Sequence, residues 1–191
     1  MKKILIMAAC SAIAVGVLAE TKPFQASLTP DIAIQSKDTR IDGVALSIWG
    51  ENPQSAFALG FVNGSTGDSK GFSLGLLNYS EDYTGVQWGI VNYSTGEFTG
   101  WQNGFVNYAE NMTGLQSAFV NYAEQVKGVQ FGAVNVAMQM TGLQFGWVNY
   151  AEKVDSGVQI GLVNIIKQNE WFTNFPDELA KGMVILNWRF N

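Results

Sequence analysis

A short unit that recurs along most of the chain constrains the fold more than any other feature of the sequence. The unit reads Gly-Val/Leu-Gln-x-Gly-x-Val-Asn, and Tyr-Ala-Glu follows it in several copies. Tandem units of nearly fixed length indicate a repeat architecture in which each unit packs against its neighbours. Eight copies, spaced 14 or 15 residues apart, occupy residues 56–63, 71–78, 85–92, 100–107, 114–121, 128–135, 142–149 and 157–164.

The spacing of apolar residues within each copy predicts β structure. Val86, Trp88 and Ile90 alternate with other residues, which is the period of a strand rather than that of a helix. A composition of 21 glycines and 13 % aromatic residues agrees with packed strands. Each unit therefore holds one strand and a short polar joint, and within the repeats nearly all of the charge lies in the joints.

The Asn that ends every unit favours a β-solenoid of 14–15-residue repeats. In stacked parallel coils, equivalent residues lie about 4.8 Å apart, so their amides can bond to one another along the axis. Antiparallel strands would place successive Asn residues at opposite ends of the sheet. The predicted Asn column comprises Asn63, Asn78, Asn92, Asn107, Asn121, Asn135, Asn149 and Asn164, and the predicted Gln column comprises Gln87, Gln102, Gln116, Gln130, Gln144 and Gln159.

The alternative folds are an antiparallel β-meander closed into an outer-membrane β-barrel and an open antiparallel sheet. The chain end at 187–191 resembles the aromatic closing strand of such barrels. Joints of nearly constant length give little stagger, however, whereas a closed barrel needs accumulated shear. The fourth position of the unit varies more than a stacked core site should, unless it faces outward; its residues include Trp88, Asn103, Ser117, Phe131, Phe145 and Ile160.

The chain divides into four parts. Residues 1–19 form the predicted signal peptide, and 20–55 form an N-terminal β segment that includes a degenerate copy of the unit at 43–50. The eight tandem repeats fill 56–166. Residues 167–191 form a capping insert and a terminal strand, in which a shortened copy at 182–187 closes the chain.

The N-terminus has the pattern of a secretory signal. Lys2 and Lys3 precede an uncharged apolar stretch at 4–18, and Ala19 provides a small residue for cleavage before Glu20. We therefore expect an exported protein at the outer membrane or cell surface, with the periplasm as the alternative location. A retained membrane anchor and acylation of Cys10 as a lipoprotein are the alternative interpretations of this segment.

Composition excludes several classes of function. The chain has no histidine and one cysteine, Cys10, which leaves with the signal, so neither a Ser-His-Asp triad nor a Cys-His dyad can form. A formal charge of −5 with scattered basic residues argues against a nucleic-acid partner. We expect no enzyme activity, no cofactor and no catalytic or metal site; an envelope or surface component, or the outer membrane, could be the partner.

The motif Gly-Val-Gln-x-Gly-x-Val-Asn-Tyr-Ala-Glu and the preceding segment at 23–30 resemble a family of exported bacterial surface-repeat proteins. Some members resemble sequences labelled as polyhydroxyalkanoate synthase. Such synthases use a cysteine nucleophile with Asp and His, and this chain has no His. The resemblance therefore implies a surface location and no established activity.

Two recurring groups of side chains are candidate sites. The joint carboxylates could line up as a calcium-binding edge or form a solvated acidic rim, and the rim is the preferred interpretation. Tyrosines after the Asn could stack on sugars or anchor at a membrane interface, although packing at the turn is preferred. The carboxylates are Glu81, Asp82, Glu97, Glu110, Glu124, Glu152 and Asp155; the tyrosines are Tyr79, Tyr93, Tyr108, Tyr122 and Tyr150.

Three further features have structural roles in this interpretation. The repeated glycines provide close backbone approach or positive φ rather than a phosphate loop. The aromatic residues of the insert, such as Trp171 and Phe175, are expected to cover the open edge of the last repeat. An apolar residue just before each glycine gives the returning limb of a coil something to bury: Tyr83, Phe98, Met112, Val126 and Met140.

Overall fold

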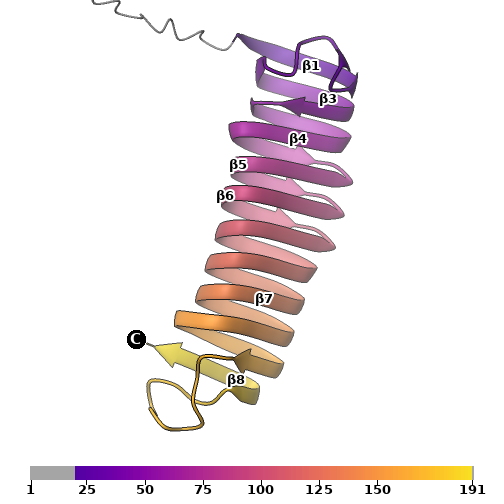
Figure 1. The fold of residues 1–191 in the computed structure, drawn as a ribbon. Helices are drawn as coiled ribbons and strands as arrows, with labels where there is room; N and C mark the ends of the chain where they lie inside the picture. Colours follow the sequence, from indigo (N-terminus) through magenta and orange to yellow (C-terminus); the bar gives the residue numbers. More distant parts are fainter. Residues whose placement is uncertain (1–19, 191) are drawn as a thin grey trace, which may run out of the picture.

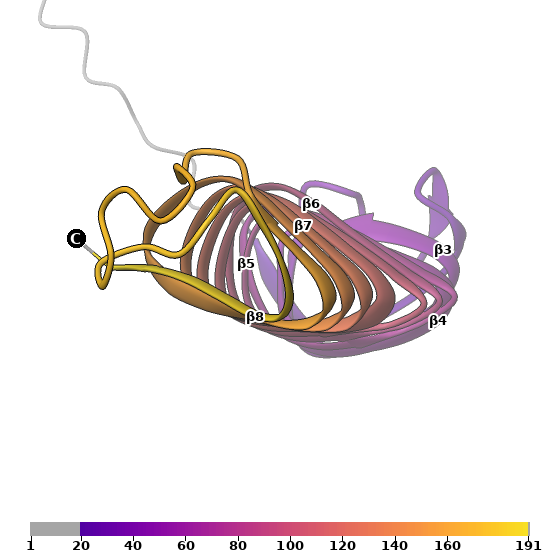
Figure 2. The ribbon, with the colours of Figure 1, turned by 90° about the horizontal axis from the view of Figure 1, so that it is seen from below.

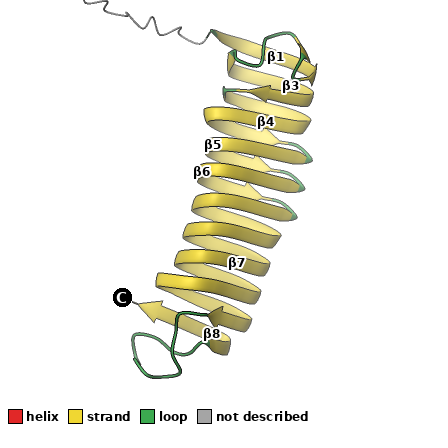
Figure 3. Ribbon diagram, in the orientation of Figure 1, coloured by secondary structure: helices red, strands yellow, loops and turns green. Residues whose placement is uncertain are grey.

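The computed structural model describes residues 20–190, so the predicted signal peptide and Cys10 lie outside the described residues. Within this range every regular element is a strand (Figure 3). The strands are β1 (Thr21–Thr29), β2 (Ile32–Ala33), β3 (Arg40–Asn52), β4 (Gln54–Leu74), β5 (Leu77–Trp88), β6 (Val91–Asn103), β7 (Val106–Ile166) and β8 (Gly182–Phe190).

The chain winds into a β-solenoid of stacked parallel coils (Figure 1). Each residue of a unit pairs with its equivalent in the next coil: Asn78 lies opposite Asn92, and Gln87 lies opposite Gln102. The degenerate copy joins the same stack, since Gly50 of β3 pairs with Asn63 of β4. The predicted solenoid is confirmed, and the barrel alternative is wrong because consecutive units run parallel rather than antiparallel.

Each coil is a flattened oval when it is viewed along the stack (Figure 2). In the C-terminal half the backbone passes around the narrow ends without leaving strand geometry, so β7 spans 61 residues and several coils. Where a unit is 15 rather than 14 residues long, the extra residue forms a bulge in the polar joint, as between Ser94 and Glu97 opposite β7. The columns on the rest of the coil therefore stay aligned.

An antiparallel strand pairs with each end of the stack, although the two-residue β2 contacts only the end of β1. The short β2 pairs with β1 at the N-terminal end, and β8 pairs with β7 at the other, with Asn187 opposite Gln159. The prediction that the insert's aromatics cover this edge is wrong, since Trp171 and Phe175 are each 63 % exposed. An antiparallel strand fits the edge better, because it supplies the N–H and C=O partners that aromatic rings lack.

Four side chains of each coil point inward, and from the coil that begins at Gly85 onward two of them are amides. Gln116, Asn121, Ala123 and Val126 are all buried. The apolar column before the glycines is buried as predicted, and its aromatic members Tyr83 and Phe98 stack with ring centroids 5.7 Å apart. The interior is thin, and the two aromatic rings fit there because they stack nearly parallel to each other.

The predicted Asn column is confirmed as a continuous ladder. From Asn63 to Asn164, each Nδ2 donates to the Oδ1 of the next Asn toward the C-terminus, at 2.7 to 3.0 Å. The second amide hydrogen binds a backbone carbonyl, as Asn121 binds that of Phe131 at 2.9 Å. Buried amides that bond in this way avoid the cost of unpaired polar groups.

The predicted Gln column is a second ladder that runs in the opposite direction. From Gln159 back to Gln87, each Nε2 donates to the Oε1 of the preceding Gln at 2.7 to 3.2 Å. The same Nε2 also reaches across the coil: that of Gln116 binds the carbonyl of Tyr122 at 3.3 Å. The glutamines thus join the two faces of a coil as well as neighbouring coils.

The first glycine of six consecutive units, from Gly71 to Gly142, occupies a conformation that other residues rarely adopt. Gly128 has φ of +143°, and a Cβ there would lie 2.1 Å from the carbonyl oxygen of Gly114 in the preceding coil. The prediction of positive φ and close backbone approach is confirmed for this column. The missing side chains let neighbouring coils approach closely and stack in register at these positions.

Candidate functional site

The outward residues on one narrow end of the coils form a long apolar surface, which we call the apolar edge. It consists of the fourth, sixth and seventh positions of the units. Phe105 is 58 % exposed, Trp147 62 % and Leu162 68 %, although such side chains are normally buried. The fourth position faces outward, as its variability suggested. The sixth-position row comprises Phe61, Leu76, Ile90, Phe105, Phe119, Ala133, Trp147 and Leu162.

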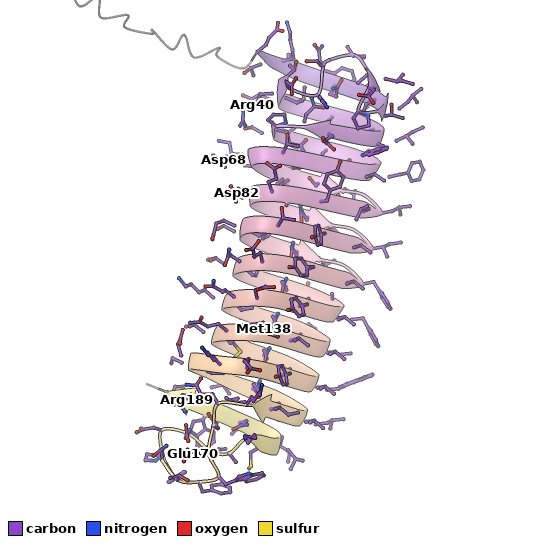
Figure 4. The ribbon with its side chains drawn as sticks, viewed as in Figure 1. Arg40, Asp68, Asp82, Met138, Glu170 and Arg189 are labelled. Atoms are coloured by element: carbon purple, nitrogen blue, oxygen red, sulfur yellow. The ribbon has the colours of Figure 1, made fainter. Side chains whose placement is uncertain are left out.

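In the repeat region, charge lies in the joints on the other side of the coils, which we call the charged edge; it includes Asp68, Asp82 and Glu97. None of the eight units, nor the residue that follows each of them, contains Asp, Glu, Lys or Arg. Figure 4 shows mainly carbon-tipped side chains along one side of the stack, whereas the labelled Arg40, Asp68 and Asp82 project from the other. The solenoid is therefore an amphipathic rod.

The predicted acidic groups lie on the charged edge and mostly contact local partners. Asp82 accepts a hydrogen bond from the backbone N–H of Glu97 at 2.8 Å, and Glu152 pairs with Lys167 at 2.7 Å. The bonds from Lys167 and Tyr150 lower the pKa of the Glu152 carboxyl. Among residues 20–190, the structure brings no three acidic, His or Cys side chains together in a way that could hold a metal ion.

The tyrosine column borders the apolar edge. The rings of Tyr93 and Tyr108 stack with centroids 4.8 Å apart, and those of Tyr108 and Tyr122 with centroids 5.4 Å apart. Because each inner ring face meets a neighbouring ring, the middle of the column has no free face on which a sugar could stack. Its hydroxyls remain outside. Partial burial, followed by nearby carboxylates such as Glu124, raises the pKa of Tyr108, so its phenol is neutral at pH 7.

A groove runs along the apolar edge between the fourth- and sixth-position rows. Its C-terminal part has a volume of about 680 Å³ and extends from Phe105 to Ile185 of β8. A second part, of about 510 Å³, lies near Leu59 and Leu76. The walls and floor of the C-terminal part, which we call the C-terminal groove, include Phe119, Phe131, Gly132, Ala133, Phe145 and Trp147.

Two features shape the C-terminal groove. Ala133 is the one small residue in the sixth-position row, and the rings of Phe119 and Trp147 meet edge to face across it, with centroids 6.5 Å apart. Toward the N-terminus the fourth-position row becomes polar, where Ser117 donates to Asn103 at 2.7 Å. The polar pair separates the two apolar parts of the groove.

Sequence reasoning predicted the columns but missed the apolar edge. The signal was present: if Gln87 faces the interior, the alternation of a strand sends Val86 and Trp88 outward. Together with the absence of charge from the units, this identifies an exposed apolar surface before any coordinates are known.

Comparison of this chain with protein-family models, with curated proteins and with solved structures finds no match. In the part of the chain that the structure describes, no helix is long and apolar enough to traverse a lipid bilayer.

Proposed function

We propose that this protein is an exported, non-catalytic repeat protein of the bacterial envelope that lies lengthwise on a lipid surface through its apolar edge. The observation that carries the proposal is the uncharged row of exposed Phe, Leu, Ile and Trp side chains opposite an edge that holds the charge. Contiguous exposed apolar surfaces of this kind mark sites of protein or membrane interaction.

The order of residue types across the rod supports a lipid surface. The apolar edge would enter the boundary between headgroups and acyl chains, as the apolar face of an interfacial helix does. The tyrosines beside it combine an apolar ring with a polar hydroxyl, which suits the depth of the headgroups. Carboxylates such as Glu110 and Glu124 would remain in water, where they are exposed in the free protein.

A second copy of the chain fits this surface less well. The rows repeat with every coil, so two rods that paired through them could slide by one coil without losing contacts. Protein interfaces usually fix one register with polar contacts and shape, whereas a fluid bilayer requires no register. The described chain is also acidic: sixteen acidic and nine basic residues remain after Lys2 and Lys3, which disfavours close pairing of copies.

Flotation with phosphatidylcholine vesicles tests the proposal. The protein with its own mature N-terminus should float with the vesicles. The triple variant Leu76→Ser, Ile90→Ser and Phe105→Ser should lose at least tenfold in partitioning, equivalent to about 1.4 kcal/mol. The matched control Glu97→Gln, Glu110→Gln and Glu124→Gln changes the charged edge of neighbouring coils and should bind at least as well as the wild type.

Lipid charge provides a second arm of the same experiment. Because the rod is acidic, vesicles that contain phosphatidylglycerol should bind it more weakly than neutral vesicles at low salt, and salt should reduce the difference. A wild-type protein that stays in the soluble fraction with both kinds of vesicle would refute the proposed function.

A further inference from the structure

We infer that the C-terminal groove holds one acyl chain of a bilayer phospholipid, drawn out of the leaflet and laid along the rod. This inference deepens the proposed function and rests on it, because the lipid surface supplies the chain. The inference assigns one ligand to one groove. The proposed function, by contrast, requires only that the apolar edge as a whole contacts the lipid surface.

The shape of the groove fits an extended alkyl chain. It lies along the stack axis from the unit that contains Phe105 to the unit that contains Leu162. Four steps between parallel strands at about 4.8 Å give a length of about 19 Å. One leaflet of a bilayer has a hydrocarbon thickness of about 15 Å, half of the usual core. A single chain of this length therefore occupies most, but not all, of the groove.

The chemistry of the lining also favours an alkyl chain. Among the described residues that line the groove, none is charged, and the indole of Trp147 is the only side chain with a hydrogen-bonding group. Glycines such as Gly132 and Gly146 form the floor between aromatic walls, so a chain can approach the backbone closely. Such a surface binds by apolar contact and gives no hold on a polar ligand.

The described lining residues of the groove include no cationic side chain, which favours a phospholipid over a free fatty acid as the ligand. A free fatty acid would bring a carboxylate, and the groove offers it no Lys or Arg among its lining residues. A phospholipid keeps its headgroup in the surface of the bilayer, so only its chain has to enter. The groove also continues the apolar edge directly, and a chain can move from one to the other without crossing water.

Ala133 provides the decisive substitution. The other seven units carry Phe, Leu, Ile or Trp at this position, so a larger side chain is compatible with the fold. Ala133→Phe would separate the rings of Phe119 and Trp147, which now meet across this position, and so reshape the wall of the groove while leaving the edge at least as apolar. Met138→Phe, which adds the same ring to the other side of the same coil, is the matched control (Figure 4).

The experiment uses phosphatidylcholine vesicles that carry a photoactivatable diazirine near the end of one acyl chain. After flotation and illumination, mass spectrometry should place crosslinks on peptides that contain Phe131, Phe145 and Trp147. In Ala133→Phe these crosslinks should fall at least fivefold, while the vesicle-bound fraction and the melting temperature stay within error of the Met138→Phe control. If Ala133→Phe does not fold, Ala133→Leu, which reproduces the residue of two other units, replaces it.

Several outcomes would overturn the inference. Crosslinks spread evenly along the apolar edge and unchanged in Ala133→Phe would leave the proposed function standing but remove the groove as a site. Binding of free palmitate that displaces the label would assign the groove to a fatty acid instead. A wild-type dimer that Ala133→Phe converts to a monomer would make it a pairing surface. Failure of the wild type to float would remove both proposals together.

Discussion

The side-chain amide of Asn121 donates a hydrogen bond of 2.9 Å to Oδ1 of Asn135 in the next coil, and both residues are fully buried. Asn121 in turn accepts from Asn107 at 3.0 Å. Because the Asn ladder lies in the interior, we expect it to contribute to the stability of the fold. Replacing one of its asparagines tests this contribution.

Asn121→Leu should destabilise the protein strongly. The substitution keeps a similar volume but removes the donor to Oδ1 of Asn135 and to the carbonyl of Phe131, and it removes one of the three acceptors of the Asn107 amide. Each unpaired buried group costs about 1 to 3 kcal/mol, so the free energy of unfolding should fall by several kcal/mol, measured by urea denaturation. Asn111→Leu, at a partly exposed site in the joint, is the control and should change the midpoint little.

Gly128→Ala should prevent close stacking of two coils. A Cβ at this position would lie 2.1 Å from the carbonyl oxygen of Gly114, in a backbone conformation with φ of +143°. Positive φ alone costs about 1 to 3 kcal/mol, and the clash adds to it. Gly182→Ala is the control, since a Cβ there meets nothing within 4 Å. Equal melting temperatures for the two variants would contradict this account of the glycine column.

Sequence patterns predicted the solenoid, the two amide columns and the buried column that includes Phe98, because each depends on a local rule that repeats in every unit. The C-terminal end of the stack, by contrast, is not built from the repeated unit. The sequence did not reveal that β8 runs antiparallel or that Trp171 stays exposed, since both depend on how one irregular segment folds back. The groove was equally hidden, because it lies between two rows of outward side chains and its limits depend on single residues such as Asn103, Ser117 and Ala133.

Tyr83 should make stability sensitive to alkaline pH. Burial raises the pKa of its phenol to about 12, and its hydroxyl bonds Ser73 at 3.0 Å. The folded chain holds this proton more tightly than the unfolded chain, whose tyrosines have a pKa near 10. The stabilising contribution is therefore complete below about pH 10 and is lost between pH 10 and 12, by roughly 2 to 3 kcal/mol.

The Tyr83→Phe variant tests this contribution. Phe98 occupies the equivalent place in the next coil, so a phenylalanine ring fits the column. The variant should lose some stability at pH 8, because the buried Ser73 hydroxyl loses its partner, yet its stability should decline less between pH 10 and 12. Urea midpoints at pH 8 and pH 11 measure both effects, with the exposed Tyr93→Phe as the control. An unchanged alkaline decline in Tyr83→Phe would show that another group titrates.

Arg189→Met should loosen the C-terminal cap. The buried carboxylate of Glu178 pairs with Arg189 and accepts the backbone N–H of Glu170 at 2.9 Å. Removal of one partner of a buried pair costs about 3 to 5 kcal/mol. Hydrogen exchange should therefore accelerate along residues 158–165, which pair with β8. Lys167→Met, which breaks an exposed pair with Glu152, should leave this exchange unchanged.

Export predicts a defined N-terminus. Protein isolated from the envelope should begin at Glu20 or within a few residues of it, because Ala19 ends the predicted signal. N-terminal sequencing measures this directly. Intact Met1 on most molecules would contradict cleavage and return the segment to the anchor interpretation.

The opposite directions of the two amide ladders allow the rod to be long. Aligned amide dipoles add up along an α-helix and leave partial charges at its ends. Here Asn121 points its N–H toward the C-terminus and Gln130 points its N–H toward the N-terminus, so the dipoles of the two interior rows oppose each other. Each added coil contributes one Asn to the first row and one Gln to the second. The interior can therefore be extended coil by coil without building up a side-chain field along the axis.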